Sequence, residues 1–407
     1  MNNFNKLVLA IAISLAASVQ AAETPSAVRF RSTDSDLIPT TLVRTKSAAL
    51  PGTRRETAPV RMSWVLAAGT AITAQQPHIG ESREYWTTID AQTLSKGTTL
   101  HTTSTGAVVR LSPVGQANVA MLDPFAVEIR AHGQRYEHGK AFANAANVAE
   151  LNASGASFSA GTVAFKLKPE VGSGAITLAL PNAQQSYLVH VFEPDSNELL
   201  TLTTDRLVAM HGSRLRVIAR MNAGAAVDAI AGTMLSPSGV EVELAFKRQR
   251  DGSYVADVDH NGVSGAGAGL WEIHAFASSK NGTVQRDART AIASAAPRAR
   301  LAGAGSSKLD SDGALRVSLN TEVAASGRYE LRGTLYGIDV ATGKLRPAAM
   351  AHAASILGAG AQSLELVYDA TTMQKAGVRA PFQVRELTLI DQAEQSIIEM
   401  RTAGLQL

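Results

Sequence analysis

The stretch Thr162-Val163-Ala164-Phe165-Lys166-Leu167-Lys168 decides how this chain is expected to fold. Its large apolar residues occupy every second position, which is the pattern of a strand with one buried face. The turn residues Gly172-Ser173-Gly174 follow, and residues 176–180 alternate in the same way. Two alternating runs joined by a glycine-containing turn predict a β-hairpin.

The neighbouring sequence indicates further strands and two helical segments. Residues 185–192 are apolar on both faces, as in a central strand that is covered on both sides. A short helical turn is expected from Asp90 to Ser95, with Asp90 as the N-cap. The alanine-rich residues 140–151 predict a second helix.

From residue 198 to 297 the pattern changes to short strands that recur every eight to twelve residues. Such spacing is typical of a β-sandwich, and we place Trp271 in its core. A tight turn is expected at Ser236-Pro237-Ser238-Gly239. The candidate strands are residues 214–221, 229–235, 241–248, 253–258, 269–278 and 289–294.

The beginning of the chain predicts export. Lys6 precedes an apolar run from Leu7 to Ala17, and Val19-Gln20-Ala21 resembles a cleavage site of small residues. These are the parts of a secretory signal peptide, whereas a membrane-spanning helix needs about 20 apolar residues. No later stretch is apolar enough to cross a membrane, so we expect no transmembrane segment in the mature chain.

Composition narrows the class of protein further. The 407 residues include no cysteine, so disulfides, thiol nucleophiles and thiolate metal sites are excluded. The hydrophobic content of 45% allows the chain to bury large cores instead. A net charge of +3 is too small to indicate a nucleic-acid partner.

Two further segments resemble known modules. Arg250-Asp251-Gly252-Ser253-Tyr254, followed by residues 269–277, resembles the strand pattern of immunoglobulin-like domains in secreted bacterial proteins, and Ala380-Pro381-Phe382-Gln383-Val384-Arg385 resembles a strand of C-terminal modules of that kind. Together with Arg83-Glu84-Tyr85-Trp86 and residues 106–113, the chain resembles an uncharacterised family of exported bacterial proteins, a domain of unknown function. The resemblance covers roughly residues 60 to 407. It implies a fold and a compartment, but no catalytic residue.

These observations predict a mainly β protein, with a β-rich N-terminal domain followed by two immunoglobulin-like β-sandwiches. The expected boundaries are a signal peptide at 1–21, an extended or partly disordered arm at 22–62, the N-terminal domain at 63–195, and the sandwiches at 196–298 and 299–407. A short helical turn is expected near residues 371–377, between two strands of the last sandwich.

The sequence contains none of the common catalytic motifs that we sought. G-x-S-x-G, H-E-x-x-H, the phosphate-binding G-x-x-x-x-G-K-[ST] and a dinucleotide fingerprint are all missing. A hydrolase would therefore need a site assembled from dispersed residues of the N-terminal domain. The candidates for such a site are Glu84, Asp123, Glu128, His132 and Glu137.

A calcium site is one further hypothesis, resting on Asp257, Asp259 and Asn261. These oxygen-bearing residues alternate as at the start of a calcium loop, but the twelfth position, where a bidentate carboxylate is needed, is Ala268. The favoured interpretation is therefore the polar end of a strand followed by an Asn-Gly turn, with no cofactor.

Binding residues are expected between Trp64 and Pro194. Tyr85 and Trp86 offer flat rings for stacking on a sugar or a peptide, but a core role is the favoured interpretation of both. His132, Tyr136 and His138 lie beside a glycine-containing turn, and the two histidines also form the closest imidazole pair.

The favoured function is that of an exported, non-enzymatic protein, periplasmic or secreted, which binds a protein or a glycan at the cell envelope or outside the cell. The dispersed-site hydrolase and a structural spacer of the envelope are the two alternatives. Fold alone does not decide between these classes.

Export gives the first testable prediction. The mature protein should begin near Ala22, because the small residues at positions 19–21 suit signal-peptide cleavage. Intact-mass measurement of protein recovered from the periplasm or the medium checks this. A mass that still includes residues 1–21 would contradict the prediction.

Overall fold

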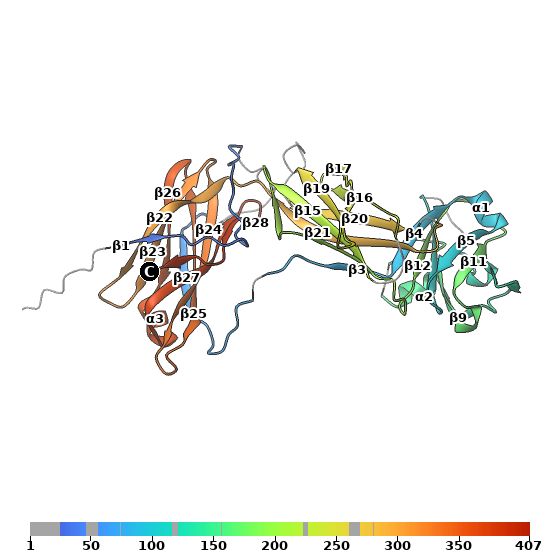
Figure 1. The fold of residues 1–407 in the computed structure, drawn as a ribbon, viewed down its shortest axis with the longest axis horizontal. Helices are drawn as coiled ribbons and strands as arrows, with labels where there is room; N and C mark the ends of the chain where they lie inside the picture. The colour runs from blue at the N-terminus through green and yellow to red at the C-terminus, as the bar shows by residue number, and fades with distance from the viewer. Residues whose placement is uncertain are drawn as a thin grey trace, which may run out of the picture.

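A computed structural model describes residues 25–45, 56–73, 75–115, 121–155, 157–222, 227–259, 269–279 and 281–407. The signal-peptide prediction lies outside these residues. Within them the strands form six sheets, almost entirely antiparallel, which pack in pairs as three sandwiches. Figure 1 shows the sandwiches in a row, with the N-terminal and C-terminal modules at opposite ends. The prediction of a mainly β protein is confirmed.

The N-terminal module packs two sheets around one core. The first has the order β4-β12-β6-β10-β9, with bounds Glu84–Ile89, Tyr187–Phe192, Val108–Pro113, Val163–Leu167 and Phe142–Asn147. The second has the order β5-β11-β7-β8, with bounds Thr98–Thr102, Gly174–Ala179, Glu128–Ala131 and Gln134–Tyr136. Two short 3-10 turns, η1 (Pro124–Ala126) and η2 (Pro169–Val171), connect strands.

The alternating stretch at 162–168 forms β10, and its three large apolar side chains are buried as expected. The hairpin prediction is wrong, because β10 pairs with β6 and β9 whereas β11 pairs with β5 and β7. The chain crosses from one sheet to the other through η2, so the two runs face each other across the core. A period of two identifies a buried face but does not identify the partner strand.

One of the two expected helices is present and one is displaced. Helix α1 (Ala91–Lys96) begins after Asp90, whose side chain accepts a hydrogen bond from the Thr93 amide. The helix expected at 140–151 is wrong over its first half, which forms strand β9. Helix α2 (Val148–Ala153) begins only where Asn147 and Glu150 form a capping box, which shows that local capping outweighs alanine content here.

The middle module is a second sandwich. One sheet has the order β18-β19-β15-β13-β3, with bounds Lys247–Arg248, Tyr254–Asp259, Arg214–Met221, Leu200–Thr204 and Gly80–Ser82. The other has the order β14-β21-β20-β16-β17, with bounds Val208–Met210, Gln285–Ala295, Gly269–Ser278, Ala229–Leu235 and Glu241–Glu243. Trp271 is buried in the core between them, as predicted.

The single strand expected at 241–248 is divided in the structure. Strand β17 pairs with β16 in one sheet and β18 pairs with β19 in the other. Between them the amide of buried Leu244 donates to the Gly232 carbonyl oxygen. This segment therefore bridges the two sheets of the sandwich.

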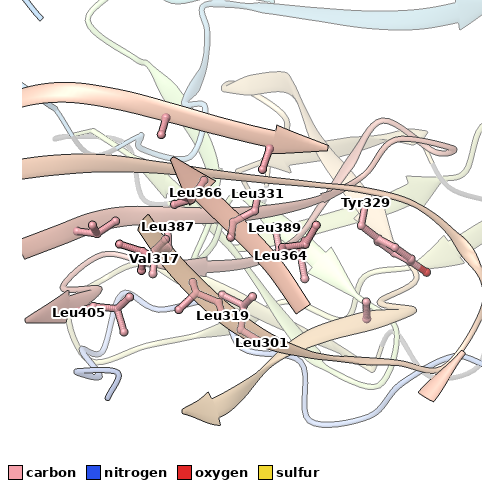
Figure 2. Packing of buried hydrophobic residues seen from close by; sticks show 14 of the residues in the cluster. Leu301, Val317, Leu319, Tyr329, Leu331, Leu364, Leu366, Leu387, Leu389 and Leu405 are labelled. Carbon is pink, nitrogen blue, oxygen red and sulfur yellow. The ribbon is translucent and has the colours of Figure 1, made fainter. Parts of the chain in front are cut away.

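The C-terminal module has the largest core, and Figure 2 shows side chains from both of its sheets meeting there. One sheet has the order β1-β22-β23-β26, with bounds Ser26–Arg29, Ala299–Leu309, Leu315–Val323 and Gly360–Tyr368. The other has the order β2-β25-β24-β27-β28, with β29 also on β27; the bounds are Val60–Val65, Leu345–Leu357, Gly327–Asp339, Val378–Asp391, Ser396–Arg401 and Leu405–Gln406. Helix α3 (Ala370–Ala376) ends at Gly377, whose φ of 62° suits glycine.

The first strands of the described chain belong to the C-terminal module. We expected an arm at 22–62 and the N-terminal domain from residue 63, but β1 and β2 are edge strands of the C-terminal module. Strand β3 is likewise an edge strand of the middle module. The chain then enters the N-terminal module at β4 and returns through the other two. Proline and polar residues in this segment hid strands whose partners lie far away in sequence.

Specific contacts hold these donated strands. Val28 of β1 is buried opposite Gly305, where an added Cβ would lie 2.4 Å from the Ser318 carbonyl oxygen. In β2 the Ser63 hydroxyl donates to Asp369 over 2.5 Å, and the Asp369 amide donates back over 3.1 Å. Each sheet of the C-terminal module thus gains an edge strand that a C-terminal fragment would lack.

We expect residues 298–407 alone to be much less stable than the same module in the whole chain, because two edge strands and the buried Val28 are missing. Urea unfolding followed by circular dichroism checks this. Adding a peptide of residues 25–65 should restore stability in proportion to its concentration, since a peptide that binds only the native state stabilises it. A peptide with Val28→Asp and Ser63→Pro is the matched control. Equal stability of the fragment with and without the intact peptide would contradict the prediction.

No helix in the described ranges is long and apolar enough to cross a membrane.

Candidate functional site

A fully buried ion pair joins the N-terminal and middle modules. Arg286 of β21 lies 2.8 Å from Glu193, and neither side chain is exposed. The same guanidinium donates to the Ser196 hydroxyl, the Thr103 hydroxyl and the Glu198 carbonyl oxygen, while Glu193 accepts from the Ser104 amide. Because every charge here has several partners, this cluster is a structural connection between modules.

Trp86, one of the predicted binding residues, lies at the same junction. Its ring stacks on His190 with centroids 4.7 Å apart, and the Arg289 guanidinium lies 5.3 Å from its centroid. Its backbone amide, on the outer edge of β4, donates to Asp287 of the middle module over 2.8 Å. Burial raises the pKa of Asp287 to about 6, with nearby Glu84 adding to the effect.

The other predicted binding residues lie within the N-terminal module. Tyr85 is buried in its core and donates to the His101 carbonyl oxygen over 2.9 Å. His132 and His138 have φ values of 51° and 50° at turns, and His132 contacts the Ser173 carbonyl oxygen. Tyr136 packs against the core and donates to Gln134.

The five residues considered for a hydrolase are dispersed over both sheets and the turns of the N-terminal module. Glu84 pairs with His190 over 2.8 Å on one sheet, whereas Glu128 pairs with Arg135 over 2.9 Å on the other. Glu137 also contacts Arg135, His132 lies at the turn before β8, and Asp123 caps η1 by accepting from the Phe125 amide. Each carboxylate therefore has a structural partner.

The calcium candidates have arginine partners. Asp257 lies 2.9 Å from Arg216, which holds the pKa of that carboxyl low, and Asp259 lies 3.5 Å from Arg214. Asn261 lies outside the described residues. Across the ranges that the structure describes, no three His, Asp or Glu side chains form a group that could hold a metal ion.

A cleft of about 550 Å³ lies elsewhere, on the outer face of the C-terminal module. Its floor comes from β24, β25, β27 and β28, and its walls from residues 34–37, 72–73, 75–77 and the 205–207 turn of the middle module. Polar groups and apolar side chains such as Met350, Ile390 and Ile397 line it together. Ligand sites are commonly concave, partly apolar and placed between modules.

Glu386 is the most unusual residue in this cleft. It lies at a β-bulge between β24 and β27 and has a φ of 48°, which only glycine and a few short polar residues adopt without strain. Burial raises the pKa of its carboxyl, although Tyr336, Arg385 and the Thr334 hydroxyl oppose that effect. Oε1 accepts from the Tyr336 hydroxyl, while Oε2 has no hydrogen bond of regular geometry within the described chain. Strained residues with shifted pKa values gather at functional sites.

The charges in the cleft are unequally matched. All three arginines have a carboxylate partner: Arg332 with Glu330, Arg206 with Asp205 at 2.9 Å, and Arg401 with Glu399 at 2.6 Å. Glu386, Asp34 and Asp36, by contrast, form no ion pair with any described residue. The cleft therefore carries an excess of negative charge.

An exposed aromatic residue borders the cleft. Trp64 of β2 pairs with Met350 in the ladder, and Met350 pairs with Thr334, so the three side chains share one face of the sheet. Trp64 is 40% exposed and its neighbour Met62 is 51% exposed.

A wider groove of about 1330 Å³ lies on the other sheet of this module, beside residues 40–44. Two of its three charged lining residues, Arg300 and Glu322, already pair at 2.7 Å. It is therefore the weaker candidate for a binding site.

Three β-sandwiches in a row, linked by strands that one segment donates, define a multi-module β protein. The model of the DUF4785 N-terminal domain, a domain of unknown function, matches residues 51–193, and that of its C-terminal domain matches residues 298–407. The chain belongs to the DUF4785 family, which confirms the resemblance seen in the sequence.

Solved structures agree with this assignment. A DUF4785 family protein from Legionella pneumophila superposes with a TM-score of 0.70 at 18% identity, covering 91% of this chain and 98% of that one, which shows a shared fold. The native form of Escherichia coli α2-macroglobulin gives a TM-score of 0.29 at 12% identity, over 82% of this chain and 20% of that one. That score is too low to support any inference. No curated protein matches the sequence.

Asp287 at the module junction gives a pH-dependent prediction. Its pKa of about 6 exceeds the ordinary unfolded value near 3.9, so the native state binds the proton more tightly and its contribution to stability falls as pH rises between those values. Asp287→Asn keeps an acceptor for the Trp86 amide and removes the buried charge. It should raise the free energy of unfolding by about 1–2 kcal/mol at pH 8 and by little at pH 4.

Urea unfolding of this variant at both pH values is the measurement. Asp195→Asn, an exposed residue beside the same junction, is the control and should show no such gain. A variant that is less stable than the parent at pH 8 would show that the charge itself holds the junction.

Proposed function

We propose that this protein is an exported, non-enzymatic binding protein, and that its ligand occupies the cleft on the C-terminal module. The observation that supports this most directly is the cleft itself, a cavity of about 550 Å³ enclosed by two modules and by the donated N-terminal segment. Glu386 at its bulge, Trp64 at its border and the apolar side chains between them supply both polar and apolar contacts. The leader-like residues 1–21 favour action in the periplasm or outside the cell.

Enclosure from three directions argues for a role beyond that of a spacer. Arg206 belongs to the middle module, Asp34 to the segment that follows β1, and Met350 to β25, yet all three line the same cavity. A spacer needs stable connections between modules, which the Arg286 cluster already supplies. Mixed polar and apolar groups around an open cavity are what a binding site requires.

The test is occupancy of the cleft by the neutral fluorescent probe N-phenyl-1-naphthylamine. Its emission should rise saturably with one site per chain, because the cleft offers an apolar environment of sufficient volume. Met350→Trp fills the cleft and should remove the signal. Leu345→Trp, at the exposed end of the same strand, is the matched control and should retain it. An unchanged titration with Met350→Trp would place the probe elsewhere and contradict the proposal.

A further inference from the structure

The balance of charge and apolar surface in the cleft limits what it can bind. Asp34, Asp36 and Glu386 form no ion pair within the described chain, although Arg385 is near enough to attract the Glu386 carboxyl, whereas each arginine that lines the cleft is already paired. An anionic ligand would meet this uncompensated negative charge. A cationic ligand would supply the counter-charge that the protein lacks.

The three carboxylates differ in their freedom to accept a new donor. Asp36 already accepts from the Thr33 and Thr402 amides and from the Thr33 hydroxyl, and so fixes the wall of the cleft. Asp34 is exposed at the rim. Among the described residues, Glu386 has only the Tyr336 hydroxyl as a regular hydrogen-bond donor. Asp34 is therefore the group most open to a ligand cation, while Glu386 keeps an unsatisfied acceptor in Oε2, which is shielded from solvent.

The apolar surface of the cleft favours a cation with a hydrocarbon stem. Met350 lies between Thr334, beside Glu386, and Trp64 at the sheet edge. A flexible thioether surface suits an unbranched alkyl chain, and the large ring of Trp64 offers further apolar surface for the same chain. A strongly hydrated metal ion would make no use of these groups.

We propose that the cleft binds an aliphatic ammonium group, that is, a protonated primary amine on an alkyl stem. The ammonium group lies at the carboxylates of Glu386 and Asp34, and the stem runs along Met350 toward Trp64. A free diamine and the side chain of a lysine in a peptide share this chemistry. The proposal rests on the cleft being a binding site.

Calorimetric titration of the full chain with matched five-carbon probes tests the proposal. Cadaverine, 1-pentanol and pentanoate are all five-carbon chains: cadaverine carries an ammonium group at each end, pentanol one hydroxyl and pentanoate one carboxylate. Cadaverine should bind at least about tenfold more tightly than pentanol, and pentanoate should bind most weakly. Blocked lysine amide, compared with cadaverine, separates the two sources, since tighter binding of the blocked lysine indicates a peptide and the reverse indicates a free amine.

Variants assign the head group and the stem. Glu386→Gln and Asp34→Asn should each weaken cadaverine binding about fivefold or more, with little effect on pentanol. Asp34 is exposed, so its variant remains informative even if Glu386→Gln were to perturb folding. Glu322→Gln, on the opposite sheet, is the matched control and should leave binding unchanged. Because the chain has three tryptophans, a cadaverine-induced change in emission that Trp64→Phe abolishes places the stem beside Trp64.

The outcomes separate this inference from the proposed function. If pentanoate binds as tightly as cadaverine, or if neither carboxylate variant weakens cadaverine binding, the ammonium assignment is overturned. The proposal that the cleft is a binding site still holds in that case, provided that the parent protein binds the naphthylamine probe and the Met350→Trp variant does not. If that probe also fails to bind, both proposals fall.

Discussion

The architecture depends on the pairing of the N-terminal strands with the C-terminal module. Strands β1 and β2 each complete one of its two sheets, and β3 completes a sheet of the middle module. Unpaired sheet edges attract other chains, so a strand that occupies an edge also protects it. Because β2 ends at Val65 and β3 begins at Gly80, the same short segment must span two modules and limits how far they can separate. The cleft walls at residues 72–73 and 75–77 are a direct result of that path.

Two different junctions fix the row of modules. Between the N-terminal and middle modules, Arg286 and Glu193 are wholly buried, and removal of one partner from such a pair leaves an unpaired charge at a cost of about 3–5 kcal/mol. Where the chain passes from the middle to the C-terminal module, Arg298 contacts Asp391 and Glu394, and the core of the C-terminal module includes Val208 and Ala295 of the middle one. The second junction therefore has an apolar component as well, and it forms one side of the cleft through Arg206.

Local patterns predicted much of the framework. Strands β15, β16 and β20 have the bounds that turn spacing indicated, Trp271 is in the core, and Asp90 caps α1. The prediction of a hairpin from β10 and β11 was wrong because alternation is a property of a single strand. Which strands pair depends on the packing of the whole module. The candidate site was missed for the same reason. Glu386 appears in sequence as an ordinary strand residue, and its cleft exists only because segments near residues 34, 72, 206 and 350 meet around it.

The pairing of Ser26 with Ser307 also has a consequence for synthesis. Strand β1 is made before any of the three sandwiches, yet its partner β22 follows two of them. Closing so long a loop is entropically slow, and until then an extended segment with an unpaired backbone stays open to wrong partners. The last module to be completed should therefore be the one to which the first strands belong.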